Sequence, residues 1–420
     1  MKNRELSQTE IRRIPKEWRV IQLEEVIKDI KNGFASGKRD DNGIVQIRMN
    51  NVTTDGHLIF NSFLKVPVRE NINEFLLKEN DLLFNNTNSI DLVGKSTLFK
   101  SVSFPCTFSN HFTRVRFRDD VIPEWVLFHF IGLWRKGFFR SVAIRHVGQA
   151  AVQTKYVTNL KIPLPPLPEQ KKIAEILSTA DQAVEKINKA RDKTQRLKKG
   201  LMQELLTKGL RQKEFKDTEI GRIPKQWEIV KISELGKTIT GGTPPTSNNT
   251  FWNGNIPFIT PADVKEDKYV CKTERYITSE GARKVGFILP TGTVLVVCIG
   301  STIGKTGVIY GEGIINQQIN AIICDEKVNK DYVYYAVTFR AGLLKSLSGV
   351  AAVPIIKKSL FEQFKLPLPP LPEQRKIAEI LSGVDERLDL LRTRKEKLNK
   401  IKKGLMNDLL TGRKRVRLEG

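Results

Sequence analysis

The chain has 420 residues, which at roughly 100 to 200 residues per domain predicts two or three domains and excludes a single small module. Hydrophobic residues make up 40% and charged residues 28% of the sequence, as in ordinary globular proteins, so wholesale disorder is excluded. The 70 Lys and Arg against 46 Asp and Glu leave a net charge of +24, which predicts a polyanionic partner, nucleic acid before anionic membrane.

The first segment of the chain contains T-E-I-R-R-I-P-K-E-W-R-V-I-Q-L at residues 9–23, and its Ile-Pro-Lys-x-Trp core returns later. The residues that follow mix short apolar runs with Gly and Asn turns, and residues 124–132 have the pattern of a helix. Residues 1–160 are therefore predicted to form a first domain of mixed α/β type.

A proline-rich stretch follows, in which Pro163, Pro165, Pro166 and Pro168 hold the chain extended. Pro168 suits the first turn of a helix, and Glu169 places a carboxylate at the positive end of that helix. An SH3-type ligand is the rival interpretation. Because a helical pattern follows directly, the stretch is interpreted as a stiff joint that leads into a first long helix, within residues 161–208.

Residues 209–360 are predicted to be a linker and a second mixed α/β domain. The Ile-Pro-Lys-x-Trp core reappears within residues 218–232, strands are expected at 293–299, 307–309 and 319–323, and a helix is expected at 330–339. Otherwise the two domains share only landmarks, such as Gly33 with Gly242, Gly94 with Gly304 and Gly148 with Gly349. We expect one scaffold with two different surfaces.

A second long helix and a basic C-terminal tail are predicted for residues 361–420. Residues 365–385 repeat residues 161–181 at an offset of 365 − 161 = 204, and the match continues without a gap to residues 401–411. Both helices show an apolar heptad seam, interrupted by the basic residues Arg191, Lys198, Lys395 and Lys402. Each helix would be about 60 Å long at 1.5 Å per residue, and the shared seam predicts that the two pair with each other.

The sequence lacks convincing catalytic motifs. Residues 300–306, G-S-T-I-G-K-T, resemble a phosphate-binding loop, but the spacing is one residue short and the matching site in the first half lacks the first Gly. We interpret them as a turn between strands that carries Lys305, and nucleotide binding remains the alternative. No segment suited to a flipped base, a methyl-donor cofactor or a nuclease centre is found.

Cysteine and targeting patterns are negative as well. The four cysteines form no Cys-x-x-Cys pair and the four histidines do not have metal-ligand spacing, so neither a disulfide framework nor a metal site is predicted. The N-terminus lacks the apolar region of a signal peptide, and no stretch approaches the ~18 apolar residues of a membrane span. A cytoplasmic protein without a membrane partner is expected.

What remains is a supply of side chains suited to DNA in predicted loops, because Arg and Lys pair with guanine, Asn and Gln pair with adenine, and all of them reach phosphates. In the first domain the candidates are Arg48, Asn50, Asn85, Asn86, Lys95, His111, Arg114, Arg145 and Gln149. In the second domain they are Thr243, Thr260, Lys305, Gln317, Gln318, Lys357 and Lys358.

The repeated P-L-P-P-L-P-E-Q-x-K-I-A-E-I-L-S, the helix ends G-L-M-x-x-L-L-T, the I-P-K-x-W starts and the G-G-T-P-P turn with I-P-F-I-T within residues 240–260 together resemble the specificity subunits of type I restriction-modification enzymes. The resemblance covers essentially the whole chain. In the first domain residues 32–37, N-G-F-A-S-G, replace the G-G-T-P-P turn.

The resemblance implies two target recognition domains, each of which reads one half of a bipartite, asymmetric site in double-stranded DNA. It implies that the two long helices form an antiparallel coiled coil, with an internal pseudo-twofold repeat. Two methyltransferase subunits would dock on these helices, with Glu169, Gln170, Glu373 and Gln374 of the repeated Pro-Glu-Gln as candidate contacts, and two restriction and motor subunits would join them. The chain itself would be non-catalytic and bind no cofactor, while the other subunits use S-adenosylmethionine, ATP and magnesium.

Two further functions remain open from the residues alone. A related system, in which one partner fuses methyltransferase and nuclease, would use a similar specificity subunit. A pure scaffold, in which the helices only join proteins, would show no sequence preference on DNA.

Overall fold

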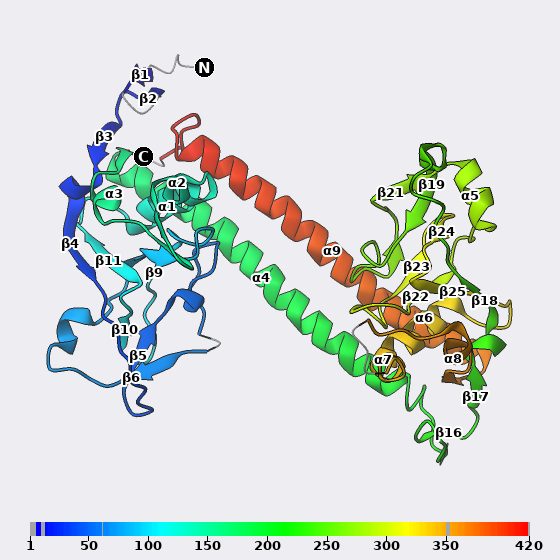
Figure 1. The fold of residues 1–420 in the computed structure, drawn as a ribbon. Coiled ribbons are helices and arrows are strands. Elements are labelled where there is room, and N and C mark those ends of the chain that lie inside the picture. The colour runs from blue at the N-terminus through cyan, green and yellow to red at the C-terminus, as the bar shows by residue number, and fades with distance from the viewer. Residues whose placement is uncertain (1–5, 10–12, 61, 350–352, 419–420) are drawn as a thin grey trace. The chain divides into compact units, whose positions relative to one another are not determined.

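The computed structural model of the chain describes residues 6–9, 13–60, 62–349 and 353–418. The chain divides into two compact units, one formed by residues 1–186 with 395–420 and the other by residues 187–394. Each unit therefore combines one globular domain with parts of both long helices (Figure 1).

The first unit has a four-stranded sheet in the order β4-β11-β7-β9, a three-stranded sheet β10-β5-β6 and a hairpin that pairs as β12-β13-β8. Its strands are β1 (Leu6–Gln8), β2 (Arg13–Pro15), β3 (Arg19–Gln22), β4 (Ile27–Asn32), β5 (Ile44–Ile47), β6 (Leu64–Val66), β7 (Leu82–Asn85), β8 (Thr87–Asn88), β9 (Ser96–Leu98), β10 (Cys106–Phe108), β11 (Phe112–Phe117), β12 (Ile144–His146), β13 (Gln149–Ala151) and β14 (Lys161–Leu164). Its short helices are α1 (Pro123–Arg135), α2 (Phe138–Val142) and α3 (Lys155–Thr158), with 3-10 turns at Leu23–Val26, Met49–Asn51 and Ile72–Phe75.

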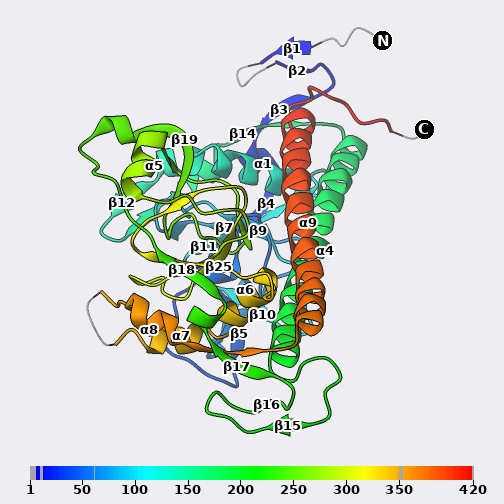
Figure 2. The same ribbon diagram turned by 90° about the vertical axis from the view of Figure 1, so that its right-hand side faces the viewer.

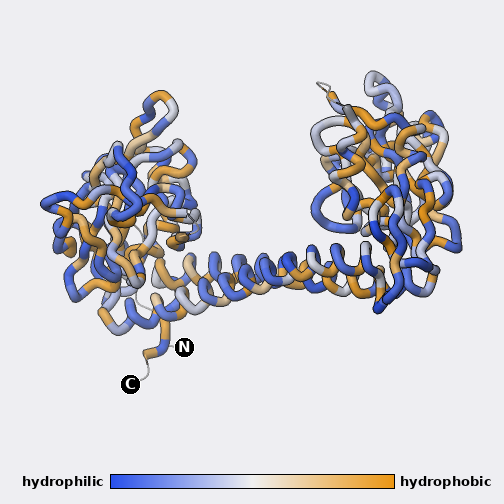
Figure 3. The backbone as a smooth tube through the Cα atoms, turned by 90° about the horizontal axis from the view of Figure 1, so that it is seen from below, coloured by the Kyte–Doolittle hydropathy of each residue, from blue (hydrophilic) through white to orange (hydrophobic). Residues whose placement is uncertain are grey.

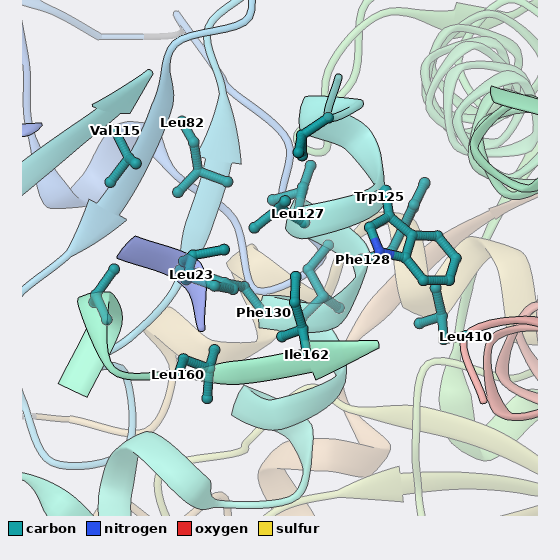
Figure 4. Close-up of a cluster of buried hydrophobic side chains, with 14 of the residues drawn as sticks. Leu23, Leu82, Val115, Trp125, Leu127, Phe128, Phe130, Leu160, Ile162 and Leu410 are labelled. Carbon is teal, nitrogen blue, oxygen red and sulfur yellow. The ribbon is translucent and has the colours of Figure 1, made fainter. Parts of the chain in front are cut away.

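Helix α1 packs on the sheet through a run of large apolar residues, and the same core takes in the end of the second long helix. Trp125 and Phe130 are fully buried, and they belong to one cluster with Leu82, Ile162 and Leu410 (Figure 4). The predicted helix at residues 124–132 is confirmed as part of α1.

The second unit has a five-stranded sheet in the order β18-β25-β22-β23-β20 and a three-stranded sheet β21-β19-β24. Its strands are β15 (Phe215–Lys216), β16 (Ile223–Pro224), β17 (Glu228–Lys231), β18 (Gly236–Thr240), β19 (Trp252–Ile259), β20 (Tyr269–Val270), β21 (Arg275–Ile277), β22 (Val294–Val297), β23 (Thr306–Ile309), β24 (Ile314–Ile315), β25 (Ile319–Cys324) and β26 (Lys365–Leu368). Its short helices are α5 (Ser279–Val285), α6 (Lys330–Phe339), α7 (Ala341–Ser346) and α8 (Lys358–Glu362), with 3-10 turns at Ile232–Glu234 and Asn249–Phe251.

The predicted strands and helix of the second domain are confirmed as β22, β23, β25 and α6. Their apolar runs are continuous because β22, β23 and most of β25 are buried on both faces. Helix α6 lies beside α9 (Figure 2). The hydroxyl of Tyr335 in α6 donates a hydrogen bond to Asp385 in α9 at 2.7 Å.

The two long helices are α4 (Leu167–Leu205) and α9 (Leu371–Leu409), each of 39 residues. Figure 3 shows hydrophilic residues alternating with hydrophobic ones along both, as expected for helices that bury only a seam. The proline-rich lead-ins are strands: β14 pairs antiparallel with β3, and β26 pairs antiparallel with β17. Because Ile162 to Pro165 are buried in this pairing, the stretch is part of the fold rather than an exposed ligand.

The basic residues that interrupt the heptad seam are explained in part by ion pairs between the helices. In the first unit Lys402, with 4% of its side chain exposed, pairs with Asp181. In the second unit Lys198 pairs with Asp385 at 2.5 Å. Two of the four basic positions in the seam are thus neutralised by an aspartate from the facing helix.

Replacing Lys402 by Met should lower the free energy of unfolding of the first unit by about 3 kcal/mol, because it leaves the Asp181 carboxylate unpaired in a nearly dry site. Urea denaturation measures the loss. Lys403→Met, at an exposed neighbouring position, is the matched control and should be neutral. The double variant Asp181→Leu with Lys402→Met should recover most of the loss; a double variant as unstable as the single one would contradict the ion-pair argument.

Candidate nucleic-acid interface

The two globular domains share one set of backbone hydrogen bonds at the end where the sheet strands meet the loops. A turn closed by Phe112 N–H to Ser109 O in the first domain corresponds to one closed by Ile319 N–H to Asn316 O in the second. Four further backbone hydrogen bonds of the first domain have a counterpart in the second, each written from the N–H donor to the carbonyl acceptor. They are Asn86→His111 with Cys298→Gln318; Val152→Asn86 with Ile356→Cys298; Ser109→Ile47 with Asn316→Ile259; and Gly33→Phe112 with Gly241→Ile319. The scaffold is therefore repeated although the side chains on it differ.

These pairs correct two of the landmarks expected from sequence. Gly33 corresponds to Gly241 rather than Gly242. Gly33 N–H donates to Phe112 O and Gly241 N–H donates to Ile319 O, and Phe112 and Ile319 are the equivalent residues that close the two turns. Val152 N–H donates to Asn86 O where Ile356 N–H donates to Cys298 O, so Val152 corresponds to Ile356 and not to the Val353 that the match of Gly148 with Gly349 implies. The match of Gly94 with Gly304 is confirmed. Gly94 N–H donates to Asn85 O and Gly304 N–H donates to Val297 O, and these two acceptors directly precede the equivalent residues Asn86 and Cys298.

Three first-domain candidates are buried and hold the scaffold together. The Lys95 ammonium donates to Val52 O at 2.7 Å and Met49 O at 3.2 Å, and burial lowers the pKa of this ammonium. The Asn85 amide donates to His111 O at 2.8 Å. Arg114 pairs with Asp29 and is 2% exposed. All three side chains are buried and make contacts that hold the domain together, and their contact with DNA stays a prediction.

The other first-domain candidates lie on or near the surface at the end that carries the turn. Asn50, Arg145 and Gln149 are exposed, and Arg48, Asn86 and His111 are half-buried. Arg145 and Gln149 belong to the β12–β13 hairpin, whose strand β13 pairs with β8 beside Asn85 and Asn86. Because Ser109 N–H bonds to Ile47 O, Arg48 follows directly beside the turn that carries His111.

In the second domain the candidates gather around the turn from Asn316 to Ile319. The Thr243 hydroxyl donates to Gln317 Oε1 at 2.5 Å, and the Asn316 amide donates to Gln318 Oε1 at 3.0 Å. The Thr260 hydroxyl donates to Asp263 at 2.7 Å. This network holds the exposed amide of Gln317 on a fixed turn, beside the half-buried Gln318 and the buried Asn316.

Lys305, Lys357 and Lys358 are exposed. Lys305 lies in the turn between β22 and β23, and Gly304 adopts a φ of +90° there. The turn carrying a lysine that was expected at this position is confirmed.

Sequence reasoning missed Ser109, Asn110 and Asn316 as parts of these turns. The turns read Ser-Asn-His-Phe and Asn-Gln-Gln-Ile, which share no residue at matching positions. Only the repeated backbone hydrogen bonds identify them as equivalent, and a run of consecutive polar residues before a buried strand was the one available signal.

The four residues of the repeated Pro-Glu-Gln join each domain to its helix. Trp18 Nε1 donates to Glu169 at 2.9 Å, and Trp227 Nε1 donates to Glu373 at 3.0 Å. The side-chain oxygens of Gln170 and Gln374 accept from the backbone N–H of Ile122 and of Asn329, at 2.9 and 2.8 Å, at the starts of α1 and α6.

These four residues are used largely inside the chain, and their contact with a partner stays a prediction. Glu169 and Gln170 are each 1% exposed and Gln374 is 1% exposed. Glu373 is half-buried and also accepts from the Leu210 N–H at 2.7 Å.

Among the described residues, no group of three or more His, Cys, Asp or Glu is arranged to hold a metal ion. No helix within the described ranges is long and apolar enough to span a membrane.

Comparison with known proteins places this geometry in a family. The type I restriction modification DNA specificity domain matches residues 15–196 and again residues 224–400. The chain belongs to the type I restriction-modification DNA specificity family. The two matches are the two halves of the internal repeat, so each half is one copy of the family's domain.

Relatives cover the whole chain. The putative MjaX specificity subunit of Methanocaldococcus jannaschii is 30% identical over 99% of this chain and 98% of its own length. The MjaVIII specificity subunit of the same organism is 30% identical over 96% of this chain and 95% of its length. The S subunit structure from M. genitalium, at 13% identity, covers 96% of this chain and 97% of that chain with a TM-score of 0.58, which shows the same fold.

As a member of this family the chain is the specificity subunit of a type I restriction-modification system, with two recognition domains, and it is not a catalytic subunit. The alternatives of a nucleotide-binding enzyme and of a pure scaffold are thereby set aside.

Replacing Lys95 by Met should lower the free energy of unfolding by about 1 to 3 kcal/mol, because two buried carbonyls lose their donor. The equivalent substitution Lys305→Met in the second domain is the matched control and should leave stability unchanged, since that lysine is exposed. Thermal or urea denaturation measures both. Equal stability of the two variants would contradict the structural role of Lys95.

Proposed function

We propose that each recognition domain of this specificity subunit reads one half of a bipartite DNA site through the loops at its shared turn. The observation that carries the proposal is the repeated backbone scaffold with different polar side chains: Arg48 and His111 in the first domain stand where Thr260 and Gln318 stand in the second. Because hydrogen-bonding side chains discriminate base edges, two different sets on one scaffold read two different sequences.

We further propose that α4 and α9 form an antiparallel coiled coil with internal pseudo-twofold symmetry. The ion pairs support this, because adding 204 to each residue number exchanges the helices: Asp181 becomes Asp385 and Lys198 becomes Lys402. When the two helices change places, the Asp181–Lys402 pair therefore falls on the Asp385–Lys198 pair, as a twofold repeat requires.

The same repeat supports the proposal that two methyltransferase subunits bind this chain, one on each copy of the repeated surface. A groove of about 770 Å³ in the first unit is lined by Met406, Asn407 and Leu133. A groove of about 850 Å³ in the second unit is lined by Met202, Gln203 and Phe339. Met202 and Gln203 are the counterparts of Met406 and Asn407 in the repeat, so one partner surface fits twice.

Two restriction and motor subunits would complete the assembly, and S-adenosylmethionine, ATP and magnesium would be used by those partners. We propose that the complex acts on chromosomal DNA in the cytoplasm. The domain boundaries expected from sequence, 1–160, 161–208, 209–360 and 361–420, stay a prediction for the exchangeable parts of the chain.

Exchange of residues 18–160 for the matching segment of a relative should change one half-site and leave the other intact. The boundaries preserve the scaffold because the relative's segment supplies its own Trp to the buried Glu169. Mapping of methylated bases in host DNA, with the methyltransferase subunit present, measures both half-sites. A change in both half-sites would show that one domain does not read one half-site.

The reconstituted complex with the methyltransferase subunits should bind DNA with an affinity that falls steeply as salt rises, because basic side chains on both domains displace counterions from phosphates. A protein with 6 to 10 phosphate contacts loses roughly 10³- to 10⁵-fold between 50 and 200 mM salt. Fluorescence anisotropy over this range measures the slope. A flat dependence would contradict the electrostatic part of the proposal.

A further inference from the structure

The two reading turns differ in charge at equivalent places. Arg48 in the first domain corresponds to Thr260 in the second, since Ser109 N–H bonds to Ile47 O where Asn316 N–H bonds to Ile259 O. The residue that caps this position also differs: the Arg48 N–H donates to Asn51 at 2.9 Å, and the Thr260 N–H donates to Asp263 at 2.8 Å. In the first domain the backbone N–H of an arginine is capped by a neutral amide, whereas in the second domain the backbone N–H and the hydroxyl of a threonine are both capped by a buried carboxylate.

We propose that the first domain reads a guanine with Arg48 and that the second domain reads an adenine with Gln317. The proposal rests on the proposed function, in which each domain reads one half-site, and it names the base pair that one side chain in each domain selects.

The guanidinium of Arg48 is not neutralised within the chain. It makes no ion pair in the described part of the chain, and its Nη2 reaches only Gln46 Oε1 at 3.3 Å. By contrast Arg116, in the same domain, pairs with Asp81 at 2.6 Å. Arg48 therefore keeps a full positive charge beside the reading turn, and its paired N–H groups match the two acceptors, O6 and N7, that guanine shows in the major groove.

Polar atoms around Arg48 lack partners as well. Parallel pairing of β10 with β5 places Thr107 opposite Gln46, so the next alternate residues, Ser109 and Arg48, share that face. Arg48 Nε, Ser109 Oγ and His111 Nδ1 have no hydrogen-bond partner among the described residues, whereas buried polar atoms are normally satisfied. The first turn is thus left with hydrogen-bonding capacity that the protein does not use.

His111 does not compete with Arg48 for the same acceptors as a second cation. Burial, and secondly the charge of Arg48, lower the pKa of the His111 imidazole below its ordinary value, which favours the neutral form of this side chain. The guanidinium is the one charged group of this turn that can face a base, and the imidazole can donate or accept beside it.

The second turn has the opposite character. Asp263 is 6% exposed and accepts from both the N–H and the hydroxyl of Thr260. A carboxylate under the reading surface repels the paired acceptors of guanine and favours a base edge that presents a donor, as the N6 amine of adenine does.

Gln317 is held in a position to bind a base edge that presents a donor. It is exposed, and its Oε1 accepts from the Thr243 hydroxyl at 2.5 Å, which orients the amide. The Gly-Gly turn makes this possible, because a Cβ on Gly241 would lie 2.0 Å from Asn316 O. An amide with one oriented oxygen and a free NH₂ matches the N6 donor and N7 acceptor of adenine.

The test maps methylated motifs in DNA from cells that express the complete complex of this chain with its methyltransferase subunit. Arg48→Ala should relax one G·C pair in a single half-site, and Gln317→Ala should relax one A·T pair in the other. Each bidentate contact contributes about 1 to 3 kcal/mol of discrimination, which is roughly a 5- to 150-fold loss of preference at that pair. Arg48→Lys should keep part of the methylation efficiency but lose the preference, because an ammonium is not bidentate.

Matched controls are Arg118→Ala and Gln226→Ala. Arg118 follows the opposite end of β11 from His111, and Gln226 precedes the buried Trp227 at the helix junction; both are exposed. Neither variant should change the motif. The thermal midpoint of every variant is measured alongside, so that a loss of folding is separated from a loss of reading.

The proposal is overturned if Arg48→Ala lowers methylation equally at all sites with the motif unchanged, which marks a phosphate contact, or if the relaxed pair is A·T. Relaxation of a G·C pair by Gln317→Ala overturns the second part. If the wild-type complex methylates no bipartite motif, the proposed function itself has failed, and that outcome is distinct because it appears before any variant is made.

Discussion

A carboxylate at the start of each long helix that accepts a hydrogen bond from a tryptophan indole is the interaction on which the rest of the structure depends. Glu169 holds Trp18 in the first unit, and Glu373 holds Trp227 in the second. A charge removed from water is costly unless it is hydrogen-bonded and paired; Glu169 also pairs with Arg415 at 2.6 Å, while Glu373 accepts from the Leu210 N–H. Because these carboxylates are satisfied only when domain, helix and following segment are together, each domain has one way to sit on its helix.

That fixed attachment lets the reading surface vary without cost to the fold. The turns at Ser109 and Asn316 are held by backbone hydrogen bonds, which any residue can make, so their side chains are free to differ. Where a candidate side chain does support the scaffold, as Lys95 does through Val52 O and Met49 O, the counterpart Lys305 is exposed and the second domain holds the turn without it. Some cations of the chain are thus buried and hold the fold, while others, such as Lys305, are exposed.

Polar pairs also occur in the seam between the long helices. Lys198 and Lys402 occupy seam positions that would otherwise be apolar, and each is paired with an aspartate of the facing helix. Polar pairs at such positions specify register, because a shift along the helix would leave both charges unpaired in a partly dry interface. Register in turn decides which faces of α4 and α9 remain exposed.

The sequence by itself determined the architecture of this protein: two mixed α/β domains, two helices in register at an offset of 204 residues, and the family to which these motifs belong. These features repeat, and repetition is visible in residue letters. Only the tertiary structure decided which polar side chains are available. Arg114 and Arg48 are the same residue type in the sequence, yet Asp29 from another strand neutralises Arg114, and within the described ranges no carboxylate pairs with Arg48. Likewise the Glu-Gln of each helix start was visible as a repeat, but its use inside the fold depends on Trp18 and Trp227, which lie far away in the sequence. Burial and pairing arise between distant segments, so no local pattern could separate the residues that hold this scaffold from those that remain exposed.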